Sequence, residues 1–241
     1  MKLSGCVAVT LLVASVFFGA HAWAEKESFS GDLFEKGSDR KVLLFKFRHE
    51  AESTGGVYQR AHNVFVDTEG HEALTEDIAY DAMGQLTKLV LDQKQTNEHG
   101  ELEVREGKIY FSWTHDGKTK TASEKQPADL VVAATLVPYL QKNWEALVKG
   151  DRVDARFAAL DRRETVGFKF LKTEEKKLNG RDAIVVKMKA SSLIISAIVD
   201  PLYFVFDKET KRLMELTGRT APKRLVKGAW KDLDAEIVYQ Y

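Results

Sequence analysis

Cysteine is nearly absent from this 241-residue sequence, because Cys6 is the only one. A single cysteine near the N-terminus leaves no pair for a disulfide and no set of thiolates for a metal. It also leaves the body of the chain without a thiol nucleophile. The protein must therefore be held together by its own hydrophobic core, which a chain of this length can bury.

Proline is scarce as well, with four in the whole sequence. No repeat, low-complexity tract or Gly/Ser-rich linker divides the chain, and the glycines are scattered as turn residues. All-β domains of about 200 residues commonly form one unit. We therefore expect a single β-rich domain at 25–241.

Long hydrophobic runs are missing except at the beginning, where Lys2, an apolar segment at 7–18 and the small-residue motif AWA follow one another. This order is typical of a secretory signal peptide, here cleaved after Ala24. The apolar segment is shorter than the about 20 residues that a membrane span requires. The letters LSGC resemble a lipoprotein box but precede the apolar segment, so we expect no lipid anchor. We expect a chain exported to the bacterial periplasm, with residues 1–24 removed and no transmembrane span left.

An excess of charge of one sign is absent too, since 36 basic residues balance 36 acidic ones. This balance argues against nucleic acid as a partner. The sequence has no G-x-S-x-G elbow and no H-E-x-x-H motif. His49 and His62 are expected to lie close together, but a metal site needs a third ligand. We predict no enzymatic activity, no cofactor and no metal.

Alternation of apolar and polar residues with a period of two is the dominant pattern that is present. KVLLFKFRHEAES places Phe47 and His49 on one face, and the Gly-Gly pair that follows suits a tight hairpin turn. A two-residue turn would set Phe47 opposite Val64 and His49 opposite His62. Later strands are expected at 78–82, 86–95, 102–106, 108–114, 153–160, 166–178, 183–189, 202–206, 213–217 and 235–241.

One helix is expected among the strands. Asp129 can cap its first turn, and Gly150 can end it. Pro138 lies inside and should kink or split it. Its apolar face would consist of Leu136, Leu140, Trp144 and Leu147. We predict a mainly β fold in which one large curved antiparallel sheet, an open half-barrel, wraps around this long Pro-kinked helix.

The strand at 202–206 is apolar on both faces and follows an aliphatic segment at 193–199 that ends at Asp200-Pro201. A strand with two apolar faces must be covered on both. The helix can cover one face. The other face requires loops, a further layer or a bound apolar ligand.

Two segments together resemble a family of uncharacterised bacterial periplasmic proteins. They are NWEALVKGDRVDARFAALDRRETVGFKF and DPLYFVFDKETKRLMELTGR, about the C-terminal half of the expected mature chain. The matching positions are Trp144, Leu147, Gly150, Val153, Asp200, Pro201, Phe206, Asp207, Thr210, Leu213, Gly218 and Arg219. The resemblance implies a periplasmic protein without an assigned function. A curved sheet around a helix also resembles the lipoprotein carriers LolA and LolB, in architecture alone.

A groove between helix and sheet is therefore one functional hypothesis, in which the protein binds or carries a lipid-like ligand. The apolar residues expected to line this groove, or to form a closed core, are Phe45, Phe47, Val64, Val66, Leu136, Leu140, Trp144, Phe204 and Phe206.

A basic stretch, GRTAPKRLVKGAWK at 218–231, suggests the alternative of a non-catalytic protein that interacts with an envelope partner. It contains no acidic residue and carries Trp230 among its cations. A basic loop with an aromatic residue can contact an anionic surface, although more often it is a solvated connection. The expected contact residues are Arg219, Lys223, Arg224 and Lys227.

Overall fold

The computed structural model describes residues 24–197 and 199–241. The expected signal peptide therefore lies outside the described residues, apart from Ala24, which begins the first strand. The strands are β1 (Ala24–Glu35), β2 (Leu43–Thr54), β3 (Val57–Asp67), β4 (Glu72–Tyr80), β5 (Leu86–Gln93), β6 (Glu98–Arg105), β7 (Lys108–His115), β8 (Lys118–Lys125), β9 (Leu130–Val131), β10 (Val153–Ala159), β11 (Glu164–Leu178), β12 (Arg181–Ala190), β13 (Leu202–Asp207), β14 (Leu213–Val226) and β15 (Ala229–Gln240). The helices are α1 (Ala133–Lys142), α2 (Trp144–Lys149) and α3 (Leu193–Ser196).

All fifteen strands belong to one sheet, in the order β8-β7-β6-β5-β4-β3-β2-β1-β15-β14-β13-β12-β11-β10-β9. Neighbouring strands are consecutive in sequence, except that β1 pairs with β15. Every pair is antiparallel except β9 with β10. The two ends of the sheet, β8 and β9, are not paired with each other, so the sheet stays open. The predicted open, mainly β architecture is confirmed.

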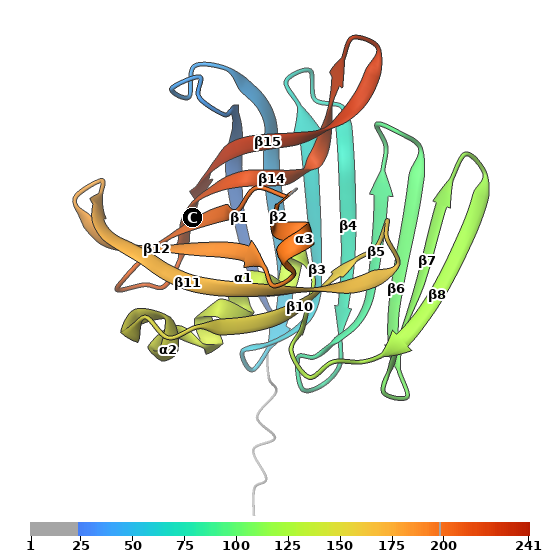
Figure 1. The fold of residues 1–241 in the computed structure, drawn as a ribbon, viewed down its shortest axis with the longest axis horizontal. Coiled ribbons are helices and arrows are strands. Elements are labelled where there is room, and N and C mark those ends of the chain that lie inside the picture. Colours follow the sequence, from blue (N-terminus) through green and yellow to red (C-terminus); the bar gives the residue numbers. More distant parts are fainter. Residues whose placement is uncertain (1–23, 198) are drawn as a thin grey trace, which may run out of the picture.

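The sheet folds over on itself. In Figure 1, strands β1 to β8 run from top to bottom, and β10 to β15 run across them. The face enclosed between these halves, called the inner face below, carries the three largest hydrophobic clusters. Helices α1 and α2 pack against the inner face of β10 to β13 through Leu136, Leu140, Trp144 and Leu147, as the sequence predicts.

The hairpin between β2 and β3 turns at Gly55-Gly56 as predicted, but its expected register is wrong. A register shift between Glu52 and Ser53 marks a β-bulge, and Phe47 consequently lies opposite Phe65. A bulge adds one residue to one strand, and a shift of one residue moves every side chain beyond it to the other face. Alternation alone carries no trace of this extra residue.

Val64 and Val66 therefore project from the outer face of the sheet, opposite Arg48 and Lys46. The expected pair of His49 and His62 is also wrong. His49 pairs with Asn63, and His62 pairs with Glu50, so the two rings lie on opposite faces.

The helix differs from its prediction at both its start and its break. Its N-cap is Val132 and not Asp129, because the residues before it form β9, which pairs with β10. The hydroxyl of Thr135 accepts a hydrogen bond from the amide of Val132 at 2.9 Å and closes the first turn. The break falls at Asn143, where the backbone leaves helical geometry, and not at Pro138.

The basic stretch at 218–231 is not a loop, which corrects a further expectation. It forms the end of β14 and the start of β15, joined by a turn at Lys227 and Gly228. Both turn residues have positive φ values, 50° and 78°. Two such residues make the narrow turn that matches the twist of a hairpin.

The strand at 202–206 is covered on both faces by the protein itself. Phe204 and Phe206 face α2 and the core of the inner side. On the outer side Val205 packs with Val185 and Ala183, and all three are buried. The aliphatic segment before this strand contains the short helix α3, which leaves Leu193 and Ile194 among the most exposed apolar residues.

Gly100 in β6 provides a test of the packing between the halves. A methyl group at this position would lie 2.7 Å from the ring of Trp113 and 2.9 Å from Leu160. Substitution Gly100→Ala should therefore lower the free energy of unfolding by about 1–3 kcal/mol. Urea denaturation measures this loss, and adding Trp113→Leu should restore part of it. Unchanged stability of Gly100→Ala would contradict the close packing.

Candidate functional site

The nine apolar residues expected to line a groove are distributed over two clusters and the outer face. Phe45 and Phe47 pack with residues of β1, β3, β4 and β15. Leu136, Leu140, Trp144, Phe204 and Phe206 belong to the cluster around the helices. All nine are buried, at most 8% exposed, except the half-buried Val66. The residues of the first two groups pack as parts of a filled core.

A polar row crosses the inner face one layer away from Phe47. His49 donates from Nδ1 to the Oδ1 atom of Asn63 at 2.7 Å, and the amide of Asn63 donates to Glu76 at 2.8 Å. The tautomer of His49 follows from this arrangement, since the amide oxygen can only accept. The ring of Phe29 stacks on His49 on one side and on Tyr241 on the other.

Burial controls the charge of this row. Burial lowers the pKa of His49, against the raising effect of the hydrogen bond with Asn63. Burial raises the pKa of Glu76, and the hydrogen bond from Asn63 offsets only part of this effect. Both side chains are therefore shifted toward their neutral forms. The row behaves as a hydrogen-bonded part of the core.

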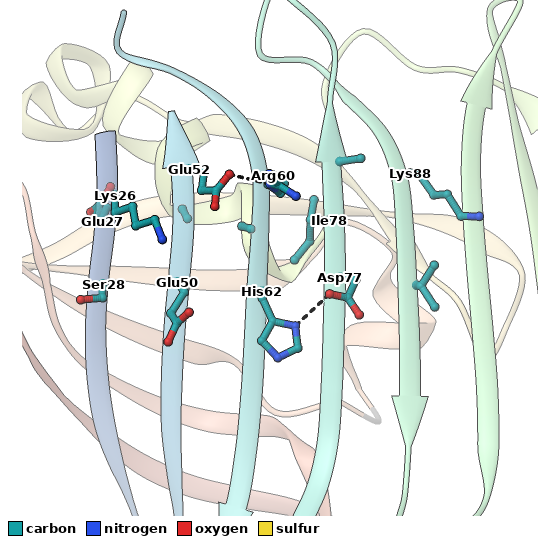
Figure 2. Close-up of a pocket in the computed structure, with 14 residues that line it drawn as sticks. Lys26, Glu27, Ser28, Glu50, Glu52, Arg60, His62, Asp77, Ile78 and Lys88 are labelled. Carbon is teal, nitrogen blue, oxygen red and sulfur yellow. Dashed lines mark hydrogen bonds and ion pairs between the residues drawn. The ribbon is translucent and has the colours of Figure 1, made fainter. Parts of the chain in front are cut away.

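A trough of about 530 Å³ lies on the outer face of β1 to β5. Two cross-strand rows of charged residues border it. Figure 2 shows Glu52 pointing toward Arg60 and His62 toward Asp77, with distances of 2.6 Å and 2.8 Å. These four side chains pair with each other, whereas Lys26 and Glu50, which also line the trough, have no ion-pair partner among the described residues. The trough has the character of a solvated sheet face.

No metal centre emerges from the described residues, among which no three His, Cys, Asp or Glu side chains are grouped in a suitable way. The helices of the described segments are also too short or too polar to cross a bilayer.

The four basic residues expected to make surface contacts have different environments. Arg219 forms ion pairs within the β14–β15 hairpin, whereas Lys223 and Arg224 fix the hairpin to the body. Arg219 pairs with Asp232 at 2.5 Å and Asp234 at 2.8 Å on the neighbouring strand. Arg224 pairs with Glu35 at the end of β1.

Lys223 is held mainly through its backbone. The side-chain oxygen of Gln95, after β5, accepts from the amide of Lys223 at 2.7 Å. The side-chain amide of Gln95 donates to the carbonyl of the same residue at 2.8 Å. These two hydrogen bonds join the base of the hairpin to the first half of the sheet.

Beyond this base the hairpin projects. β15 pairs with β1 only from Ala235 to Gln240, so residues 229–234 have no ladder partner other than β14 among the described residues. Figure 1 shows the end of this hairpin rising clear of the neighbouring strands. We call residues 225–231 the hairpin tip.

The hairpin tip exposes apolar side chains between cations. Leu225 is 56% exposed, Val226 41% and Trp230 40%. Lys227 and Lys231 have no ion-pair partner within the described segments. Large apolar side chains gathered at one projecting point indicate a contact surface more strongly than isolated ones do. The contact residues expected from the sequence lie mostly at the base of this hairpin, because ion pairing cannot be read from a list of cations.

Comparison with known proteins gives one match of fold. No family model matches the sequence, and no curated protein matches it. The fold is similar to the crystal structure of a β-barrel-like protein from Brucella abortus, a domain of unknown function (DUF1849). The two chains share 11% identity, the TM-score is 0.41, and the match covers 89% of this chain and 94% of that chain. The comparison adds no activity, ligand or partner.

Replacement of the buried acid of the polar row gives a pH-dependent prediction. The pKa of Glu76 is raised in the folded protein, so the wild type loses stability as pH rises from the unfolded pKa of 4.5 toward the folded value. Glu76→Gln keeps an oxygen for Asn63 and removes this loss. We expect the variant to be more stable than the wild type at pH 8, with the difference disappearing below pH 4.5. Thermal unfolding from pH 4 to pH 8 measures the stability of the wild type and of Glu76→Gln. A difference in stability that stays constant over this range would disprove the raised pKa of Glu76.

Proposed function

We propose that the protein is an exported, non-catalytic interaction protein of the cell envelope that makes contact through the hairpin tip. One observation carries the proposal: Leu225, Val226 and Trp230 are exposed at the end of a projecting hairpin, next to Lys227 and Lys231. Export rests on the signal-peptide pattern, and periplasmic location follows from it as part of the proposal.

The rigid base of the hairpin supports a contact role for its tip. The pair of Arg224 with Glu35 and the two hydrogen bonds between Gln95 and Lys223 hold the base in place, and the pairs of Arg219 join its two strands. A contact element that is already ordered loses little conformational freedom on binding. The tip itself makes no comparable pairs within the described chain, so its side chains are available to a partner.

A double substitution at the tip tests this function. Leu225→Ser with Trp230→Ser should reduce association with isolated envelope fractions by at least about tenfold, because about two large side chains would no longer be buried. Sedimentation of the purified mature protein with these fractions measures the association. The two residues face each other across the hairpin and have few other contacts, so the melting temperature should change little.

Met83→Ser is the matched control, because Met83 is 74% exposed at a different turn, between β4 and β5. This variant should associate like the wild type. Equal association of the tip variant and the wild type, with both folded, would refute the proposed function.

Carriage of an apolar ligand between helix and sheet is a second candidate, which the open sheet favours. β8 and β9 are not joined, so the two halves can separate without breaking a strand pair. The residues concerned are packed against one another, however, and a ligand would have to displace helix α1 or α2.

Native mass spectrometry of protein extracted gently from the periplasm tests the second candidate. A carrier should retain a lipid-sized mass, and Leu140→Trp, which overfills the helix cluster, should reduce the retained fraction. Protein that is empty after extraction and fails to bind a fluorescent fatty acid would eliminate this function.

A further inference from the structure

We infer that the surface bound by the hairpin tip is an anionic lipid bilayer. This inference rests on the proposed function and names its partner. It draws on the charge of the tip, on its shape, and on the number of residues that it offers.

The charge of the tip is suited to anionic headgroups. Residues 223–231 contain four cations and no acid. Lys223 and Arg224 are engaged at the base, which leaves Lys227 and Lys231 near the end. Cations such as Arg60 and Arg105 are paired with a carboxylate of the neighbouring or the same strand, whereas Lys118 and Lys120 of β8, like the tip lysines, have no ion-pair partner among the described residues. The tip is therefore a local positive point on a protein with no net charge.

The shape of the tip is suited to shallow insertion. Leu225 and Trp230 are directly opposite on one face of the ribbon, and Val226 shares the other face with Lys231. From Lys223 to the turn at Lys227 the ribbon extends by about 13 Å, at about 3.3 Å per residue. A ribbon lying with its Leu225 and Trp230 face against the bilayer would place the indole of Trp230 at the headgroup level, where tryptophan is favoured.

The small size of the tip argues for a lipid surface over a folded protein partner. A stable protein interface uses about 20–30 residues on each side, whereas the tip has seven residues, from Leu225 to Lys231. The strands beside it recede, since β1 ends at Glu35 and does not follow β15 outward. A fluid bilayer can close around such a narrow element. A folded partner would find little protein surface beside the tip to contact.

Vesicle binding of the full mature protein tests the inference. Wild type should sediment with vesicles of phosphatidylcholine containing about one third phosphatidylglycerol, and should not sediment with pure phosphatidylcholine vesicles. Lys227→Glu with Lys231→Glu should lower partitioning by at least about tenfold, since each basic residue near an anionic surface contributes about fivefold. Raising the salt concentration should also weaken the binding of the wild type to the anionic vesicles, because salt screens the attraction.

Lys118→Glu with Lys120→Glu is the matched control, because these exposed lysines lie on the edge strand β8. Its charge change is the same, and it should partition like the wild type. Equal loss in this control would show a general charge effect and would overturn the inference. Equal binding to both kinds of vesicle would also overturn it, because the headgroup charge would then have no role.

The outcome separates the inference from the function on which it rests. If wild type fails to bind anionic vesicles while Leu225→Ser with Trp230→Ser still loses envelope association, the lipid inference fails and a protein partner takes its place. If neither the envelope fractions nor the vesicles retain the wild type, both fail. Circular dichroism and melting temperatures of every variant establish that a loss of binding is not a loss of fold.

Discussion

The pairing of β1 with β15 is the constraint on which the rest of the structure depends. Every other ladder joins strands that follow one another in sequence, and all of these ladders except the parallel β9–β10 pair are antiparallel. The ladder from Ser30 and Gln240 to Glu35 and Ala235 alone joins the two ends of the chain. It sets Leu33 against Ile237 and merges the two meanders into one sheet, which can then bury its inner face against itself.

The length of this ladder also determines how far the β14–β15 hairpin projects from the sheet. Because β1 ends at Glu35 while β14 and β15 continue, the hairpin has a free end, and Arg224 reaches back to Glu35 at the point of divergence. The same ladder also places an aromatic side chain over the buried polar row. Phe29 at the start of the pairing region stacks between His49 and Tyr241 and covers the end of the buried polar row. The buried core and the projecting hairpin are thus two consequences of one strand pair.

Alternation in the sequence predicted most strands and hairpin turns, because side-chain direction along a strand repeats every two residues. It missed β1, where acidic, basic and hydroxyl residues interrupt the pattern. It also missed the bulge near Glu52, which reversed the faces of Val64 and Val66. The basic stretch was recognised by composition, but its division into a paired base and an exposed tip depended on Glu35, Asp232 and Gln95, two of which lie far away in sequence.

The sequence by itself determined most of the apolar residues of the core, the absence of cysteine pairs, the β-rich class of the fold and the region of the helix, because these follow from residue type and local period. Tertiary structure alone decided that the expected groove residues other than Val64 and Val66 are packed in the core, and that Arg219 and Arg224 are ion-paired. It alone decided that Leu225 and Trp230 are exposed. The physical reason is that burial and ion pairing depend on strands brought together by one long-range ladder, and no local pattern in either strand specifies its partner.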